Sequence, residues 1–220
     1  MKPSIVIGDA AVYDDFLGQD LAHQLWGTMN MIPYSWSDSQ VWTKVWTLAD
    51  GAILRSVQWN ASAPDWQLAL NSGKQSPPAP FTQFLGFLRE VLTTKDDIPE
   101  VKSIVMIPYV WPPKSSISWH NDGDTSTPSR IGAFSYYAHK HWNAEWGGEF
   151  LLTELDTTFT QRPFDNSEIS EAIISRGYGF WASPKPNRLV INPSSMYHKV
   201  AKTTDAAAPR MSIQGFLYSV

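Results

Sequence analysis

The sequence predicts a mainly β protein of the α+β class, with a jelly-roll core and supporting helices near the N-terminus. Three observations carry this prediction. The two long helical patterns both lie in the first hundred residues. From residue 101 onward, short apolar segments alternate with turn-forming residues. The chain also holds 11 Trp and is 13% aromatic, and strands favour aromatic side chains.

The first hundred residues are expected to form two helices and a hairpin. Helices are predicted over Asp14–Asn30 and Phe81–Leu92, because apolar residues recur there at helical spacing. The second helix follows the Pro-rich residues 76–80. Between the helices, Val41–Asn60 is predicted to be a hairpin that turns at Asp50-Gly51.

Residues 101–220 are expected to form an antiparallel core of short strands bounded by turn-forming or charged residues. The predicted strands are Ser103–Tyr109, Ile117–Trp119, Ile131–Tyr137, Glu149–Leu152, Leu189–Ile191, Tyr197–Ala201 and Met211–Tyr218. The long polar stretch Thr153–Asn187 is the exception, with one helical candidate around Glu168–Ile174. A connection of this length inside a β-domain is typical of a functional lid or of an insert.

Length and charge restrict the domain count and the classes of partner. The 220 residues suffice to bury a core, so we expect a single domain over 1–220, with 1–100 supporting a core formed by 101–220. Lys and Arg number 17 against 21 Asp and Glu, which gives a net charge of -4 and no basic field for a phosphate backbone. Nucleic acid is therefore not an expected partner.

Cysteine is absent, which excludes a disulfide scaffold, a thiolate metal site and a Cys nucleophile. The apolar run near the N-terminus is too short for a signal-peptide core, and no stretch reaches the length of a membrane span. We expect a cytoplasmic protein with no membrane partner. The sequence does not indicate an oligomeric state.

Three side chains form a candidate metal site. His120 and Asp122 lie two positions apart at the end of a predicted strand, so they share one face and are able to reach one ion. His198 is a candidate third ligand. Two imidazoles and one carboxylate on one face of an octahedron are the arrangement of non-haem Fe(II) oxygenases. A His-x-Asp pair taken alone is more typical of a polar turn.

Arg210 and Ser212 open the last predicted strand, and they also share one face. A planar guanidinium beside a hydroxyl is suited to bidentate binding of a carboxylate. Arg188 is the only nearby rival cation, and it lies at the wrong end of its strand.

These residues together resemble the 2-oxoglutarate/Fe(II) oxygenase superfamily, and within it the prolyl 4-hydroxylases, which include the oxygen-sensing prolyl hydroxylases. The resemblance covers about residues 101–220. It rests on His120-x-Asp122, Tyr136-Tyr137, Gly147-Gly148-Glu149-Phe150, His198 and Arg210-x-Ser212. It implies that the core is a double-stranded β-helix, the jelly roll of that superfamily.

The resemblance also implies a role for each matching residue. The Fe(II) ligands would be His120, Asp122 and His198. The distal carboxylate of 2-oxoglutarate would be bound by Arg210, helped by Tyr136 and Ser212. Tyr109 matches a position near the cofactor or the substrate, and a tyrosine of the strand core is an equally good interpretation.

The implied reaction uses Fe(II), 2-oxoglutarate and O2 to hydroxylate an unactivated C–H bond, with release of succinate and CO2; ascorbate is an expected stimulant. Asp122 favours hydroxylation, because halogenases similar to this superfamily usually have a small residue there. The prolyl-hydroxylase likeness favours a proline in a peptide or protein as the substrate. The alternative is a free amino acid or small metabolite, whose carboxylate would be bound by Arg130, Arg162 or Arg176.

Other functions compete with this one. A non-catalytic jelly-roll module that binds carbohydrate would use the excess of Trp, but it has no reason to assemble the His120, Asp122 and His198 set with Arg210. A nucleic-acid-demethylating oxygenase would need a basic groove. A cupin would use His139 and His141, but the second cupin motif is not evident, so we interpret both as solvated turn residues.

Overall fold

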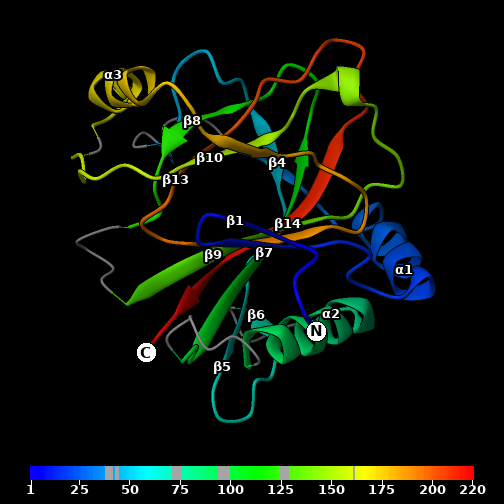
Figure 1. The fold of residues 1–220 in the computed structure, drawn as a ribbon. Coiled ribbons are helices and arrows are strands. Elements are labelled where there is room, and N and C mark those ends of the chain that lie inside the picture. The colour runs from blue at the N-terminus through cyan, green and yellow to red at the C-terminus, as the bar shows by residue number, and fades with distance from the viewer. Residues whose placement is uncertain (38–41, 43–44, 71–75, 94–99, 124–128, 161) are drawn as a thin grey trace.

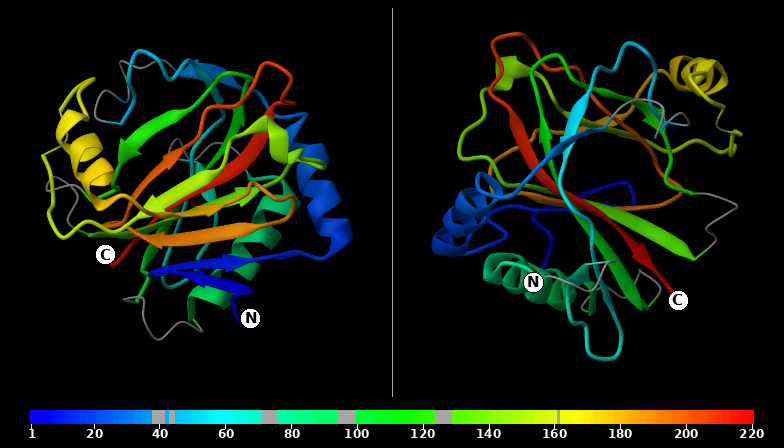
Figure 2. Two further views of the ribbon diagram at one scale, coloured as in Figure 1. Left: turned by 45° about the horizontal axis from the view of Figure 1, so that its top comes forward. Right: turned by 180° about the vertical axis from the view of Figure 1, so that it is seen from behind.

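Two antiparallel sheets face each other in the structure, a computed structural model that describes residues 1–37, 42, 45–70, 76–93, 100–123, 129–160 and 162–220 (Figure 1). Two helices cover the outer side of the larger sheet, and a third lies beside the smaller one (Figures 1 and 2). Among the described residues the architecture is thus mainly β with three α-helices, and the predicted jelly-roll fold is confirmed.

In the described part of the chain, the larger sheet has ten strands. Its main path runs in the order β1 (Ile5–Ile7), β2 (Ala10–Tyr13), β12 (Leu189–Pro193), β9 (Arg130–Tyr137), β14 (Arg210–Tyr218), β7 (Ser103–Trp111), β4 (Ile53–Arg55) and β3 (Ser35–Ser37). β5 (Trp59–Ser62) pairs with β7 and with β6 (Ala69–Leu70). The long central strands β9, β14 and β7 come from the predicted core, whereas the N-terminal strands extend its two edges.

The smaller sheet has four strands, in the order β11 (Phe180–Ala182), β10 (Phe150–Thr153), β13 (Tyr197–Val200) and β8 (Ile117–His120). A short 3-10 helix, Ala144–Trp146, precedes β10. Helix α3 (Ser167–Arg176) contacts β8. Because β8 and β13 are neighbours, two chain segments far apart in sequence meet in this sheet.

The alternation of β14 separates two cores. Met211, Ile213 and Leu217 point to the outer side of the larger sheet, where they pack in the cluster formed with α1 (Gln19–Met29) and α2 (Ala79–Thr93). Arg210 and Ser212 therefore point the other way, toward the smaller sheet. A second cluster fills that space between the sheets, so the two halves of the jelly roll are held by apolar burial on both faces.

The helices form where the apolar spacing predicts them. In α1 the buried residues Leu21, Leu25 and Met29 follow one another at four-residue intervals. The predicted helix over Asp14–Asn30 begins later, at Gln19, because Asp15 has a positive φ and the backbone N–H groups of Phe16 and Leu17 donate to Asn187. The helix predicted over Phe81–Leu92 is confirmed as α2, and the helical candidate around Glu168–Ile174 is confirmed as α3.

All seven strands predicted after residue 101 are present, with ends that shift by a few residues. The predicted hairpin over Val41–Asn60 is wrong. Val41 lies outside the described residues, the described residues before the Asp50-Gly51 turn (42 and 45–49) form no strand, and β4 pairs with β3 and β7 instead. Long-range pairing with a buried central strand outweighs a local Asp-Gly turn signal here.

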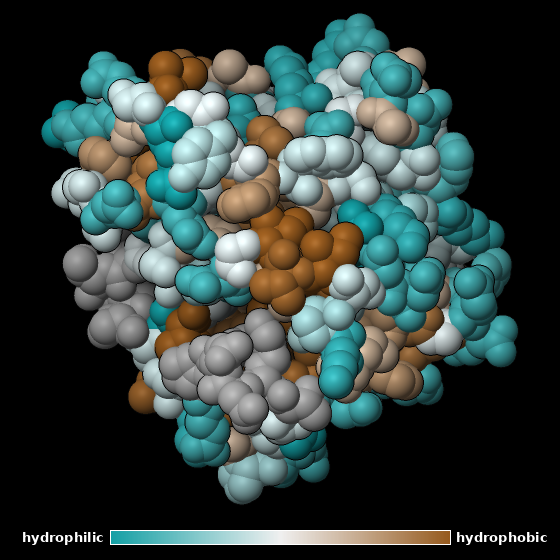
Figure 3. Space-filling view, in the orientation of Figure 1, coloured by the Kyte–Doolittle hydropathy of each residue, from teal (hydrophilic) through white to brown (hydrophobic). Residues whose placement is uncertain are grey.

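The chain surface in the orientation of Figure 1 is hydrophilic over most of its periphery (Figure 3). Apolar surface gathers near the centre of this face, and the residues of β1 include the exposed side chains of Ile5 and Val6. In the part of the chain that the structure describes, no helix has both the length and the apolar character needed to cross a bilayer.

Candidate active site

The smaller sheet brings His120, Asp122 and His198 together. His120 ends β8 and lies opposite His198 of β13 in the strand register, with ring centroids 4.2 Å apart. Asp122 follows two residues after β8, and its Oδ1 and Oδ2 lie 4.0 Å from His120 Nε2 and 3.5 Å from His198 Nε2. One ligand atom from each residue lies within 4.8 Å of the other two, and all three side chains are buried.

Each histidine is oriented by the backbone of its own strand. The Nδ1 atom of His120 lies 2.7 Å from the Ser118 carbonyl oxygen, and that of His198 lies 3.0 Å from the Met196 carbonyl oxygen. Donation from Nδ1 leaves the lone pair of Nε2 directed at Asp122. Burial is the largest cause that lowers the pKa of His120 to about 4, and the neighbouring His198 is the second. This ring is therefore neutral and able to bind a metal at neutral pH.

A cavity of about 710 Å³ lies between the two sheets and includes all three of these residues in its wall. Alternate residues of β7 line it from Val105 to Trp111, as do residues of β9 and β14. Its charged lining residues in the described chain are Arg55, Arg130 and Asp122, and the two histidines of the candidate metal site also line it. The cavity wall therefore mixes apolar and polar side chains, and its charges lie at the candidate metal site and at two arginines.

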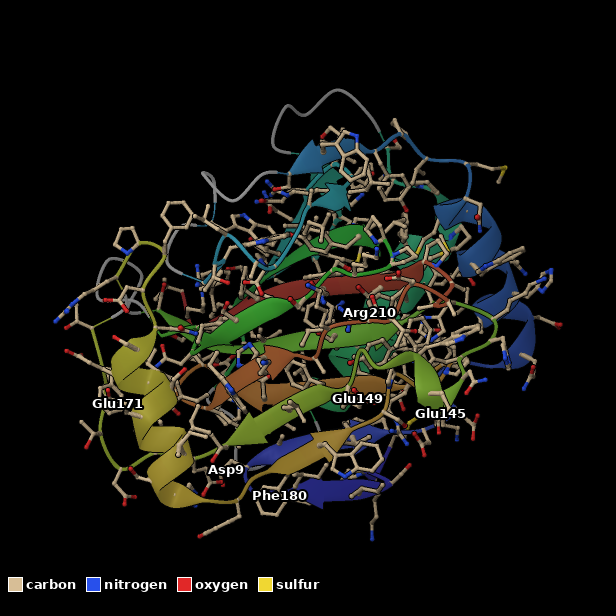
Figure 4. The ribbon with its side chains drawn as sticks, turned by 90° about the horizontal axis from the view of Figure 1, so that it is seen from above. Asp9, Glu145, Glu149, Glu171, Phe180 and Arg210 are labelled. Atoms are coloured by element: carbon tan, nitrogen blue, oxygen red, sulfur yellow. The ribbon has the colours of Figure 1, made fainter. Side chains whose placement is uncertain are left out.

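Arg210 is buried deep between the sheets, as Figure 4 shows in a view from above. Its Nη1 donates to the Gly148 carbonyl oxygen at 2.9 Å, whereas Nε and Nη2 have no hydrogen-bond partner among the described residues. The ring of Trp111 lies 4.7 Å from its guanidinium carbon. Burial lowers the pKa of Arg210 to about 10, so the side chain remains a cation at neutral pH.

The Gly147-Gly148 motif contributes to this arrangement. Both residues have left-handed backbone angles, with φ of 74° and 78°, which glycine adopts without a steric penalty. A Cβ on Gly147 would come within 2.5 Å of the Lys202 carbonyl oxygen. The motif therefore allows a close turn that presents the carbonyl of Gly148 to Arg210.

Two further buried donors lie next to Arg210. Ser212 Oγ and Trp111 Nε1 have no hydrogen-bond partner among the described residues. Trp111 lies opposite Arg210 in the strand register, and Ser212 lies two residues along the same strand. Buried donors that lack an acceptor are costly. A carboxylate from a ligand is the group that fits these donors best.

Tyr136 lies on the other face of the sheet from Arg210. Its ring packs against Phe84 at a centroid distance of 5.1 Å, and its hydroxyl donates to Asn187 Oδ1 at 3.1 Å. This position does not suit the expected contact with 2-oxoglutarate. The neighbouring Tyr137 points between the sheets, with its ring 5.8 Å from the Arg210 guanidinium carbon. Strand alternation explains the difference, because adjacent residues face opposite sides.

Tyr109 lines the cavity and lies opposite Ser212 and Arg55 in the register of the sheet. Arg188 was the alternative to Arg210 as the cation that binds a ligand carboxylate. It is paired with Asp14 instead, since its Nε and Nη2 donate to the two oxygens of Asp14 at 2.6 and 3.1 Å. The guanidinium group of Arg188 therefore links the start of β12 to the N-terminal segment.

The interpretation of His139 as a solvated turn residue is wrong. Its side chain is buried, and its Nδ1 and Nε2 lie 3.3 and 2.7 Å from the carbonyl oxygens of Met211 and Pro184. No local pattern predicts this burial, because both hydrogen-bond partners of the ring come from segments distant in the sequence. His141 is exposed, as expected.

The three arginines considered for a substrate carboxylate differ in position. Arg130 lines the cavity and donates from Nη1 to the Asp122 carbonyl oxygen at 3.1 Å. Arg162 is exposed and paired with Glu168, and Arg176 stacks on Tyr178, so neither lines this cavity. Sequence reasoning missed Arg55, which reaches the cavity from β4. No sequence motif marks it.

Two histidines and one carboxylate that bind one face of an iron ion leave its other coordination positions open. A jelly roll with this set of ligands is the arrangement of a class of non-haem iron proteins. The model of the 2OG-Fe(II) oxygenase superfamily matches residues 106–218, just over half of the chain. The chain belongs to this superfamily. A comparison with curated protein sequences found no match.

Solved structures with the same fold include several prolyl hydroxylases. A prolyl-4-hydroxylase from Pseudomonas putida is 14% identical, with a TM-score of 0.61 over 96% of this chain and 93% of the other. A Trichoplax adhaerens prolyl hydroxylase, in complex with a hypoxia inducible factor oxygen degradation domain peptide fragment, is 11% identical, with a TM-score of 0.58 over 96% and 84%. The viral collagen prolyl hydroxylase of Paramecium Bursaria Chlorella virus-1, in complex with 2OG, is 12% identical, with a TM-score of 0.54 over 96% and 97%.

The residues present fit both groups that the family implies. His120, Asp122 and His198 offer the two-nitrogen, one-carboxylate set that Fe(II) binds, with the two Nε2 atoms free of other partners in the described chain. The unpaired donors of Arg210 and Ser212 fit a carboxylate of 2-oxoglutarate. When bound, iron and 2-oxoglutarate would together use O2 to supply the oxidising chemistry that breaks an unactivated C–H bond.

Proposed function

We propose that this oxygenase hydroxylates a proline within an extended segment of a peptide or protein. The observation that carries the proposal is the shape of the cavity. Its lining follows β7 from Val105 to Trp111, a span of about 20 Å at the rise of a strand. A trough of this length accommodates several residues of an extended chain, with one of them beside the metal ligands.

The walls of the cavity suit such a substrate. Phe159, Phe150 and Phe216 line it, and flat rings offer contact area to a pyrrolidine ring. Phe159 belongs to the long connection between β10 and α3, and its backbone N–H donates to the Tyr197 hydroxyl at 2.9 Å. We propose that this segment forms one wall of the substrate channel.

In the proposed site, each protein group has a distinct task. His120, Asp122 and His198 hold the iron, and Arg210 with Ser212 anchors the distal carboxylate of 2-oxoglutarate. Tyr137 replaces Tyr136 as the tyrosine proposed to support that anchor. Tyr109 lines the cavity and lies opposite Ser212 in the strand register, beside the proposed anchor. Apolar residues from both sheets keep water away from the reacting carbon.

A free amino acid or small metabolite is the second candidate substrate, and the two arginines of the cavity favour it. Arg55 and Arg130 are half-buried, and the Nε atom of each is buried without a hydrogen-bond partner among the described residues. Either guanidinium would bind a substrate carboxylate.

One assay separates the two candidates. The protein is incubated with Fe(II), 2-oxoglutarate, ascorbate and either an unstructured Pro-containing peptide library or free L-proline, and mass spectrometry follows the gain of about 16 Da that one added oxygen atom gives. The proposal expects the gain on a prolyl residue of the peptides. A gain on free proline alone favours the small-molecule substrate, and no gain on either excludes proline.

A further inference from the structure

Asp50 is a buried carboxylate that the proposed reaction does not use. It lies before β4 with 5% of its surface exposed, and both of its oxygens accept hydrogen bonds. Ser116 Oγ donates to Oδ1 at 2.7 Å, and the backbone N–H of Thr47 donates to Oδ2 at 2.7 Å. The backbone carbonyl of Asp50 also accepts from the N–H of Ser116 at 3.0 Å. The side chain thus fastens its own segment to the start of β8.

Ser118 connects Asp50 with the metal site. Its backbone N–H and its hydroxyl both donate to Asp50 Oδ2, at 3.1 and 2.5 Å. The carbonyl oxygen of the same Ser118 receives His120 Nδ1 at 2.7 Å. Asp50 therefore holds Ser118, and Ser118 in turn holds the imidazole of His120. Hydrogen bonds through Ser118 connect this carboxylate with a metal ligand.

The two histidine ligands differ in this respect. His198 is also held by a carbonyl two residues earlier, that of Met196, but the N–H of Met196 bonds to Pro193 in its own turn. Ser118 is instead held by a residue 68 positions away in the chain. In the described part of the chain, no carboxylate supports His198 in the way that Asp50 supports His120.

We propose that Asp50 is a positioning residue for the metal ligand His120. Burying a carboxylate is costly, and the described partners of Asp50 are all neutral donors, so the arrangement does not gain the energy of an ion pair. It does gain a fixed position for Ser118 and hence for the imidazole ring. Groups behind the ligands of a metal site affect its affinity for metal about 10- to 100-fold.

The inference rests on the proposed iron site, and Asp50→Asn tests it. The amide has the same shape but no negative charge, and one of its two oxygens is replaced by an NH2 donor, so the charge-assisted hydrogen bonds that hold Ser118 are weakened even where their geometry is kept. Fe(II) affinity is measured anaerobically on the folded proteins, and Co(II) absorption spectra report the ligand geometry. We expect the Kd for Fe(II) to rise about 10- to 100-fold and the Co(II) spectrum to change.

Asp14→Asn is the control, because Asp14 is a half-buried carboxylate that also joins distant segments, through Arg188, without touching β8. It is expected to lower the melting temperature and to leave Fe(II) affinity and the Co(II) spectrum unchanged. If Asp50→Asn does not fold, Ser118→Ala decides, since it removes the hydroxyl contact and keeps the carbonyl; a rise in Kd of a few-fold is expected there.

The outcomes are distinct. Wild-type protein that binds no Fe(II) contradicts the proposed function itself. Wild-type protein that binds Fe(II), together with folded Asp50 or Ser118 variants of equal affinity and unchanged Co(II) spectrum, overturns the positioning role alone.

Discussion

His120 and His198 lie opposite each other on neighbouring antiparallel strands, and each presents Nε2 to a different oxygen of Asp122. The register of β8 and β13 thus sets the spacing of the metal ligands, because paired residues on neighbouring strands have fixed separations. Residues that are 78 positions apart in the sequence become one site through this single strand pairing.

Loss of either histidine is expected to abolish Fe(II) binding. In His120→Ala or His198→Ala, two ligands remain, which is too few to hold a labile ion in an open site. Anaerobic Fe(II) titration measures the effect, with circular dichroism as the control for folding. Retained affinity in a folded variant would remove that residue from the ligand set.

Arg210→Ala is expected to weaken 2-oxoglutarate binding about 10- to 100-fold, as the loss of a charge-assisted contact of about 1.5–3 kcal/mol implies. Fe(II) affinity should stay unchanged, because Arg210 does not contact the metal ligands. Two anaerobic calorimetric titrations measure the two affinities, one of the metal-free protein with Fe(II) and one of the Fe(II) protein with 2-oxoglutarate. An unchanged affinity for 2-oxoglutarate would place its carboxylate elsewhere, with Arg55 the first alternative.

The two adjacent tyrosines are expected to respond differently to the loss of their hydroxyls. Tyr137→Phe should raise the Kd for 2-oxoglutarate several-fold, because Tyr137 faces the space that holds Arg210. Tyr136→Phe should leave that Kd unchanged and lower stability by about 1 kcal/mol, since it loses only the bond to Asn187. The reverse pattern would restore the role first expected for Tyr136.

Stability is expected to fall on acidification because of His139. Burial is the largest cause that lowers its pKa to about 4, whereas the unfolded chain has the ordinary value of 6.5. The unfolded state therefore binds a proton first as the pH decreases, and stability is lost between about pH 6.5 and 4, by on the order of 3 kcal/mol.

His139→Gln tests this pH dependence. The variant should be less stable at pH 7.5 but should lose less stability on acidification, as urea unfolding of the metal-free protein at several pH values would show. Parallel pH profiles for the two proteins would exclude His139 as the source.

The sequence predicted the parts of this molecule that depend on local pattern. The strands after residue 101 and the helices follow from alternation and from helical spacing, and the ligands follow from one motif and its match to a family. What it did not predict depends on contacts over long distances. The pairing of β4 and β5 with β7, the burial of His139 and the contacts of Asp50 with β8 all join segments with no shared local signal.

The sequence names Tyr136 and Tyr137 as neighbours but does not tell which of them faces Arg210. Alternation along β9 determines which of the two faces Arg210, and a shift of one residue in the alignment reverses the answer. The hydrogen bond from Tyr136 to Asn187 identifies the face directly.

The most direct test of the account is the visible charge-transfer band that Fe(II) and 2-oxoglutarate give when both bind the same protein site without oxygen. We expect this band when the two are added in turn to the wild-type protein, and no band with His198→Ala. Folded wild-type protein that gives no band with excess iron and 2-oxoglutarate would contradict the proposed oxygenase site.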